Sequence, residues 1–297
     1  MFSNYLKNLH KRWLYPLIAA VIAIVVMLTP QAGQTASMLE LLLRGAQIIQ
    51  ISNISEQQEM QLGAATNQQI LQQMKVHPSR EVNGYLNSIG QRMGRASARP
   101  NMKYTFQVIQ DDNINAFATM GGYVYINSGL LKMADNEAQL AGVLGHEIGH
   151  ITGRHGIEQL KQRMIASGVS SLAGVDQNTL AQVGVELALR RPRSRADEYD
   201  ADQRGLNNLI RANYAPSAMP AFMSKLSSAN NPPTFLSTHP SPPDRVANLQ
   251  RLIPTRSRSQ TYGLESAPYR QRIQSYLGSG GSKNSTSNTG NSYRKLR

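Results

Sequence analysis

The segment His146–His150 constrains this chain most, because it reads His-Glu-Ile-Gly-His inside a stretch that we expect to be helical. On a helix, side chains at positions i and i+4 lie on the same face. His146 and His150 can therefore reach one metal ion, while Glu147 projects from the adjacent position toward a water molecule at that ion. Two neutral imidazoles beside a carboxylate are typical of zinc hydrolases in which the carboxylate is the general base. The alternative is a surface helix that carries two histidines without a metal.

The residues around this motif mark out the predicted helix. Asp135 is a candidate N-cap, and Gly153 is a candidate end. Apolar residues recur between them at helical spacing, namely Leu140, Val143, Leu144 and Ile148. Three glycines in the same stretch lower the helix propensity, so we expect another element to approach the helix closely there. These glycines are Gly142, Gly145 and Gly149.

A zinc hydrolase normally needs a third protein ligand and an open fourth position. The chain has no cysteine, so this ligand must be His, Asp or Glu. One candidate is His155, which resembles the third histidine of the metzincin motif. However, it arrives one residue too early for that motif, and on a continuing helix it would lie off the face that carries His150.

The other candidates for the third ligand are Glu198 and Asp202, in the segment 194–202. Ser194 and Asp197 form a capping box, which predicts that a helix begins there and places both carboxylates on one helical face. One carboxylate could bind the metal, and the other could accept the free ring N–H of a ligating imidazole. The alternative is a solvated acidic face that nearby arginines balance.

Several blocks of this chain, taken in order, resemble the HtpX/BepA-like family of zinc metallopeptidases, a gluzincin group that includes the CAAX prenyl endoprotease. The resemblance covers roughly residues 55–252 and includes the His-Glu-x-x-His helix. The other blocks are Glu-Met-Gln-Leu-Gly at 59–63, the run 115–131, Ser-Arg-x-x-Glu-x-x-Ala-Asp at 194–202, and Ser-Thr-His-Pro with Asp-Arg at 237–245. Met120 stands where many members have proline.

This resemblance implies a fold, a cofactor and a set of site residues. The implied fold is mainly helical α+β, a zincin-like domain with a small sheet that bears a substrate-side edge strand. The implied cofactor is one zinc ion per chain. The implied roles are zinc ligands for His146, His150 and Glu198, catalytic base for Glu147, and, for Asp202, the acceptor of the free ring N–H of a ligating imidazole.

The predicted substrate strand follows a glycine pair and consists of Gly121, Gly122, Tyr123, Val124 and Tyr125. Its aromatic and β-branched residues favour a strand. An edge strand beside a zinc site can bind an extended peptide through main-chain hydrogen bonds. Composition alone equally permits an ordinary core strand, and the resemblance favours the substrate strand.

The late block contains His239, which is similar to a family histidine that can approach the zinc from a mobile loop. As a fourth ligand it would displace water and hold the enzyme inactive, whereas as a donor it could stabilise the oxyanion of the tetrahedral intermediate. The alternative is a loop histidine fixed by neighbouring prolines. Arg245 is a weaker candidate for a carboxylate or oxyanion contact, and it could equally form a salt bridge with Asp244 or another acid.

The N-terminal residues resemble an export signal. Lys7, Lys11 and Arg12 precede an apolar run over 14–28, an order that predicts a cytoplasmic N-terminus and an exported body. The run is shorter than a typical spanning helix of about 20 residues. We therefore expect residues 1–36 to be a signal peptide or, if uncleaved, a single membrane anchor.

The remaining chain divides by composition into a connecting amphipathic segment over 37–54, a zinc metallopeptidase domain over 55–254, and a basic Ser/Gly/Asn-rich tail over 255–297. We expect the tail to be largely disordered, with a short helix possible at 267–277. The formal net charge is +13, but residues 256–297 contribute +7 and residues 1–12 contribute +3. No nucleic-acid-binding motif accompanies this charge, so we expect no nucleic-acid partner.

These patterns together predict an exported zinc-dependent endopeptidase, either periplasmic or anchored to the membrane with its body on the non-cytoplasmic side. The resemblance suggests misfolded or unassembled envelope proteins as its substrates. In the expected mechanism, metal-activated water attacks a peptide carbonyl while Glu147 takes a proton and passes it to the leaving amine. The alternative is a metal-containing chaperone or assembly factor with little proteolysis, which would also bind unfolded chains.

Overall fold

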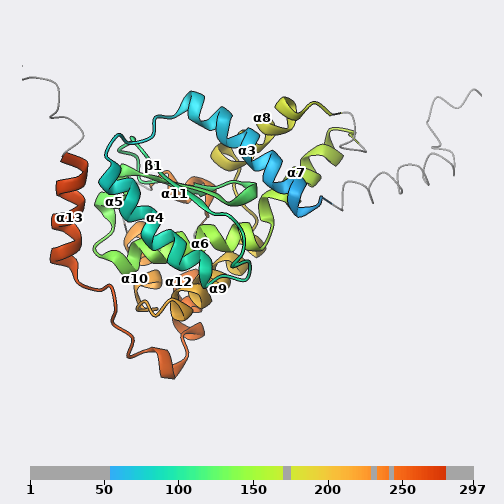
Figure 1. The fold of residues 1–297 in the computed structure, drawn as a ribbon. Coiled ribbons are helices and arrows are strands. Elements are labelled where there is room, and N and C mark those ends of the chain that lie inside the picture. The colour runs from blue at the N-terminus through green and yellow to red at the C-terminus, as the bar shows by residue number, and fades with distance from the viewer. Residues whose placement is uncertain (1–53, 170–174, 229–232, 241–243, 279–297) are drawn as a thin grey trace, which may run out of the picture. The chain divides into compact units, whose positions relative to one another are not determined.

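The computed structural model describes residues 54–169, 175–228, 233–240 and 244–278 (Figure 1). The chain divides into two units, Met1–Gln47 and Ile48–Arg297, and every described residue belongs to the second. The predicted signal or anchor at 1–36 lies outside the described residues, as does the connecting segment at 37–54 except for Ile54. In the part of the chain that the structure describes, no helix is both long and apolar enough to cross a membrane.

A small three-stranded sheet forms the centre of the described fold, with the strand order β1-β3-β2. Strand β1 (Thr105–Ile109) is parallel to β3 (Tyr123–Asn127), and β2 (Ala116–Ala118) is antiparallel to β3. The prediction that residues 121–125 form an edge strand is therefore wrong. Gly121 and Gly122 belong to the 3-10 turn η1 (Met120–Gly122), and β3 is the central strand with a neighbour on each side.

The side chains of the sheet alternate between two packed layers. Val124 and Ile126 of β3 join the main core with α4 (Arg80–Arg95) and α6 (Glu137–Thr152). On the opposite face, Tyr125 stacks on Phe117, with ring centroids 4.6 Å apart, and packs against α3 (Glu56–Gln73) and α8 (Gln177–Arg190). Successive side chains of a strand point to opposite faces, so each helical layer packs against its own set of apolar side chains. A small sheet covered by helices on both faces confirms the predicted mainly helical α+β fold.

Helix α6 is buried along almost its whole length, because every residue from Ala138 to Ile151 is buried. A helix that is buried on all sides lies in the centre of a domain rather than on its surface. Its N-cap is Asn136, whose side chain accepts a hydrogen bond from Gln139 N, and not the predicted Asp135. Gly153 is the C-cap, as predicted.

The glycines of α6 allow a second helix, α9 (Arg195–Arg211), to pack against it at very short range. A Cβ atom on Gly149 would lie 2.6 Å from Ala201 O, and one on Gly145 would lie 2.9 Å from Gly205 O. Such contacts are shorter than van der Waals packing permits, so side chains there would separate the two helices. The predicted close approach is confirmed, and it brings the side chains of α9 next to the His-Glu-x-x-His motif.

The other helices surround this pair. Ser194 caps α9 by accepting a hydrogen bond from Asp197 N, as predicted. The peripheral elements are α5 (Ser128–Met133), α7 (His155–Ala166), α10 (Ala218–Ser227), α11 (Phe235–Thr238), α12 (Asp244–Leu252), η2 (Thr255–Ser257) and α13 (Ser266–Gly278).

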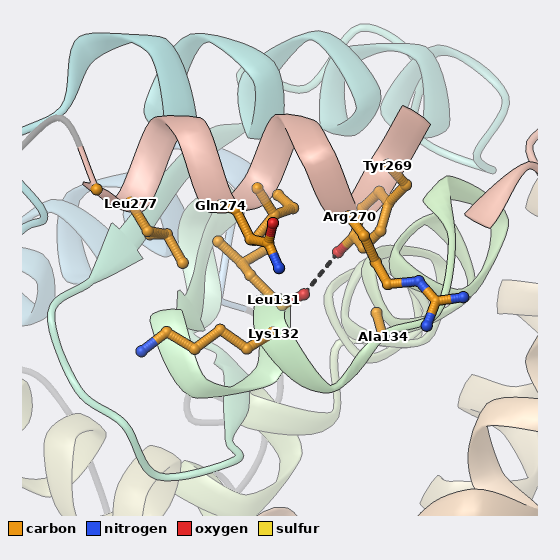
Figure 2. A pocket seen from close by; sticks show the side chains of 9 residues that line it. Leu131, Lys132, Ala134, Tyr269, Arg270, Gln274 and Leu277 are labelled. Atoms are coloured by element: carbon orange, nitrogen blue, oxygen red, sulfur yellow. Dashed lines mark hydrogen bonds between the residues drawn. The ribbon is translucent and has the colours of Figure 1, made fainter. Parts of the chain in front are cut away.

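Residues 255–278, in a tail that was expected to be largely disordered, contain η2 and α13. Helix α13 corresponds to the short helix that the sequence allows at 267–277. Tyr269 and Ile273 of α13 are each only 3% exposed, and the Tyr269 hydroxyl donates to Leu131 O of α5 (Figure 2). A cavity of about 520 Å³ lies between α5 and α13, and none of the residues that line it belongs to the His-Glu-x-x-His motif. Residues 279–297 lie outside the described part of the chain.

Candidate metal centre

Three helices bring four buried side chains together at one point. Helix α6 supplies His146 and His150, α9 supplies Glu198, and His239 follows directly after α11. One nitrogen or oxygen atom from each residue lies within 4.8 Å of the others. Each of these residues is at most 2% exposed, so their polar atoms face one another and not solvent.

The separations of these atoms fit a tetrahedral metal site. His146 Nε2 lies 3.1 Å from His150 Nε2 and 3.5 Å from Glu198 Oε2, and His150 Nε2 lies 3.3 Å from Glu198 Oε1. Ligand bonds of about 2.0–2.1 Å in a tetrahedron place neighbouring ligand atoms roughly 3.3 Å apart. The three side chains could therefore hold a metal ion with little rearrangement.

Glu147 gives a second sign that a partner belongs at this point. Its side chain is fully buried, and neither carboxylate oxygen has a hydrogen bond within the described residues. A buried carboxylate without a partner is strongly disfavoured. Oε1 of Glu147 lies 3.5 Å from Nε2 of His239, so the carboxylate faces the same small space as the candidate ligands.

Asp202 and Arg245 form the next layer around this group. Asp202 Oδ1 lies 3.0 Å from His146 Nδ1, the ring nitrogen opposite the candidate ligand atom. Arg245 is fully buried, and its guanidinium donates to both oxygens of Asp202 at 2.7 and 2.8 Å. It also lies 2.8 Å from Glu198 Oε2 and donates to Pro240 O at 2.7 Å. Arg245 thus forms its salt bridges with Asp202 and Glu198 and not with Asp244, whose carboxylate accepts from Tyr199.

The charged groups shift one another's pKa values. Burial raises the pKa of Asp202, but hydrogen bonds from Arg245 and His146 outweigh it and hold that pKa below its usual value. Burial and the nearby charge of Arg193 lower the pKa of His150 well below its usual value, which favours the neutral imidazole that a metal requires. Burial lowers the pKa of His146, but Asp202 and Glu198 raise it to about 9, so metal binding below that pH would release a proton from His146.

His239 lies inside the group and is not an exposed loop residue. Its Nδ1 atom is 3.1 Å from Glu198 Oε1 and 3.2 Å from His146 Nε2. Its ring stacks on Phe235, with centroids 4.4 Å apart. These contacts place an imidazole where a fourth ligand of a metal held by the other three residues would lie.

The edge of the sheet nearest to this group belongs to β2. Asn115 O accepts from Asn127 N, and Thr119 N donates to Tyr123 O, so the main-chain groups of Ala116 and Ala118 between them point away from β3. Ala118 O accepts a 3.3 Å hydrogen bond from the buried guanidinium of Arg193. Sequence patterns did not single out Arg193 as a site residue, because this contact depends on how the α8–α9 connection crosses the sheet edge.

His155 does not join the candidate ligands, so its interpretation as a metzincin-like third ligand is wrong. Its Nδ1 atom lies 2.8 Å from Nδ1 of His150, the ring nitrogen on the far side from Glu198. Its Nε2 atom lies 3.0 Å from Asp200 Oδ2. Asp200 was not among the predicted site residues, although it lies between Glu198 and Asp202 on α9.

Comparison with known proteins gives a consistent picture. The model of peptidase family M48 matches residues 80–253, a range that contains all the residues of the candidate centre. The putative beta-barrel assembly-enhancing protease of Vibrio cholerae is 31% identical over 236 residues, which cover 73% of this chain and 48% of that protein. The beta-barrel assembly-enhancing protease of Escherichia coli K12 is 31% identical over 216 residues, covering 67% of this chain and 44% of that protein.

A mitochondrial relative matches over a shorter range. The metalloendopeptidase OMA1 of Schizosaccharomyces pombe is 29% identical over 177 residues, which cover 57% of this chain and 52% of that protein. The chain thus spans about half the length of these curated relatives.

Proposed function

The chain belongs to peptidase family M48, and we propose that it is a zinc-dependent endopeptidase that cleaves misfolded or unassembled proteins of the cell envelope. The observation that carries the proposal is the convergence of His146, His150 and Glu198 beside the buried, unpaired carboxylate of Glu147. The first three residues would hold the zinc ion. A structural zinc site is complete with four protein ligands and does not require a further carboxylate without a hydrogen bond beside them. A hydrolytic site, in contrast, needs a base at that position.

A bound zinc ion would supply Lewis acidity to the substrate carbonyl and to the attacking water. The carboxylate of Glu147 would take one proton from that water and deliver it to the nitrogen of the leaving amine. The C–O bond forms first, and the C–N bond of the resulting tetrahedral adduct then breaks. One water molecule is consumed, both of its protons end on the amine nitrogen, and the products are one carboxylate and one ammonium group. Asp202 would accept the Nδ1–H of His146 and thereby hold its Nε2 lone pair toward the metal.

The outer edge of β2 is the best candidate for the main-chain contact with the substrate, in place of residues 121–125. Ala116 and Ala118 are buried, at 0% and 4% exposed, so the groups that cover this edge would have to move before a peptide could add to it. Ala116 and Ala118 direct main-chain groups away from β3, and an extended peptide can add to such an edge. Recognition through main-chain groups would give a loose sequence preference, which suits unfolded substrates. The guanidinium of Arg193 already donates a hydrogen bond to Ala118 O, so a bound peptide would have to displace it.

His239 would act as a switch in this scheme. It lies where a water molecule or substrate carbonyl must enter, so it would have to leave before cleavage. The competing role is that of an oxyanion donor, which would require His239 to stay close to the reacting carbonyl.

The choice of substrate class and location rests on the relatives and on the N-terminal sequence. Two relatives are named for the assembly of beta-barrel proteins, and the charge pattern before the apolar run at 14–28 predicts export. The second candidate function is a metal-containing assembly factor with little proteolysis, which the closed arrangement around His239 favours. Cell fractionation with external protease tests the location, since a body protected in the cytosol would contradict export.

Cleavage of unfolded casein by the zinc-loaded protein tests the proposed activity. Glu147→Gln keeps the size of the side chain but removes the base, so we expect cleavage to fall by at least about a hundredfold. The matched control is Glu158→Gln on the exposed surface of α7, which should leave the rate unchanged. Equal rates for Glu147→Gln and the native chain would remove Glu147 from the mechanism, and casein binding without cleavage by the native chain would favour the assembly factor.

A further inference from the structure

His155 and Asp200 form a chain of contacts that ends on His150. The chain turns at Arg154, which adopts a left-handed conformation with φ 57°, so α7 starts in a new direction. This turn returns the ring of His155 to His150, where the two Nδ1 atoms are 2.8 Å apart. The far side of the His155 ring contacts Asp200 Oδ2 at 3.0 Å.

Only one arrangement of protons satisfies all of these contacts. A neutral imidazole has one N–H group and one nitrogen lone pair. His150 must present the lone pair of Nε2 to a metal shared with Glu198, so its proton is on Nδ1. That N–H can donate to Nδ1 of His155 only if His155 carries its own proton on Nε2, from which it donates to Asp200. The reversed pair, with protons on His150 Nε2 and His155 Nδ1, would also satisfy the 2.8 Å contact, but it would turn an N–H group toward the metal and a lone pair toward Asp200. The two remaining neutral pairs would oppose two N–H groups or two lone pairs at that contact.

The surrounding residues are arranged to hold this chain of contacts. A Cβ atom on Gly153 would lie 2.5 Å from His155 Nε2 and 2.8 Å from Asp200 Oδ2, so only glycine leaves room for the pair. Arg204 donates to the same oxygen of Asp200 at 2.5 Å and anchors the carboxylate. The side chain of His155 is 8% exposed, which protects its contact with His150 from competition by water.

We propose that His155 and Asp200 are positioning residues that fix the tautomer and ring orientation of His150, as Asp202 does for His146. Helix α9 would then control both histidines of the motif, one directly through Asp202 and the other through Asp200 and His155. The inference rests on the proposed function for the presence of a metal, but it does not depend on proteolysis.

Zinc affinity measured by competition with a chromophoric chelator tests this inference. Loss of such an outer hydrogen bond typically lowers metal affinity about 10- to 100-fold. We expect His155→Leu to show this loss and Asp200→Asn a smaller one. The side-chain oxygen of asparagine can occupy the place of Nδ1 and accept from His150, so His155→Asn should recover most of the affinity. A merely structural role would give no reason for this rescue.

The control is His77→Asn. Counted over the whole residue, His77 and His155 are both 7% exposed, but His77 contacts Ser79 and none of the candidate ligands. Its zinc affinity should equal that of the native chain. Imidazole ¹⁵N chemical shifts of the zinc-loaded protein give a second readout: His150 should carry its proton on Nδ1 in the native chain and in His155→Asn.

Three results would overturn the inference: zinc affinity of His155→Leu within about twofold of the native value, an equally weak His155→Asn, or a native chain that binds no zinc. If the native chain binds zinc and the rescue occurs but casein stays intact, only the proposed proteolytic function fails.

Discussion

Arg245 is the residue whose removal should be most costly to the metal-free protein. Its guanidinium donates to both oxygens of Asp202 and to Pro240 O, and it pairs with Glu198 at 2.8 Å. Arg245→Leu would remove the guanidinium that two fully buried carboxylates share and would leave His146 as the cation in contact with both. Removing one partner of a buried ion pair costs about 3–5 kcal/mol, and the loss of a cation shared by two acids should lie near the upper end of that range.

Urea denaturation followed by circular dichroism, at neutral pH and with a chelator present, measures this effect. The matched control is Arg251→Leu, because Arg251 is exposed on the same helix α12 and its loss should change the free energy of unfolding by less than about 0.5 kcal/mol. Saturating zinc should reduce the difference between Arg245→Leu and the native chain, since the metal would take over part of the charge of Glu198. Arg245→Lys keeps the positive charge but loses the paired N–H donors of the guanidinium, so its free energy of unfolding should lie between those of Arg245→Leu and the native chain.

The pH dependence of the same experiment has a defined sign. The pKa of Asp202 is held below its usual value in the native chain, so its stabilising contribution is present above the unfolded pKa of about 3.9 and is lost as the pH falls through the folded pKa. Without Arg245, only His146 would oppose the effect of burial, so the pKa of Asp202 should rise and the carboxyl would become neutral at a higher pH. The destabilisation should therefore shrink between pH 7 and pH 5. A loss below about 1 kcal/mol at pH 7, or one that grows on acidification, would refute the reasoning.

Three further predictions follow from the same site and its packing. Glu198→Ala should retain far less zinc after dialysis than His155→Ala, and the opposite order would restore the metzincin-like interpretation. His239→Ala should raise basal casein cleavage if His239 blocks the fourth position, whereas a fall of about 10²–10³-fold would assign it to oxyanion stabilisation. Gly205→Ala should lower the free energy of unfolding, measured by urea denaturation, by about 1–3 kcal/mol, because its Cβ would meet Gly145 C at 2.8 Å, while Gly84→Ala, with open space around it, should not.

The sequence predicts the local part of the site well, because local spacing determines it. His146 and His150 share a face of α6, and Glu198 and Asp202 share a face of α9, in both cases through the i, i+4 geometry of a helix. The glycines of α6 correctly indicated a close neighbour. Asp135 and Asn136 are both good capping residues, so the pattern could not decide between them.

The parts that failed depend on long-range packing. The composition of β3 indicates a strand but not the number of strands that pair with it, so its central place could not be read from its residues. The contact of His155 with His150 requires the left-handed Arg154, a conformation that sequence patterns rarely reveal for a residue other than glycine. Helix α13 was expected only as a possibility, because the basic, polar residues around it obscure the two side chains, Tyr269 and Ile273, that it buries.

Arg193 connects substrate access with the position of His239, and this connection leads to a last prediction. Its main-chain N–H donates to Thr238 O, next to His239, while its side chain donates to Ala118 O on the edge of β2. Arg193→Met keeps the first contact and removes the second, so it should free one main-chain acceptor for the substrate without moving His239.

Without the guanidinium of Arg193, the substrate no longer competes for Ala118 O, so the change affects binding of the substrate before any bond breaks. One hydrogen bond contributes about 0.5–1.5 kcal/mol to such binding. We therefore expect KM for an unfolded substrate to fall roughly two- to tenfold. The charge of Arg193 also lowers the pKa of His150, so the assay contains saturating zinc, under which kcat should stay unchanged, whereas His239→Ala should change kcat. Arg195→Met, at the exposed first residue of α9, is the matched control. A higher KM for Arg193→Met would mean that the guanidinium helps to hold the substrate, and the edge of β2 would then bind peptide with Arg193 in place.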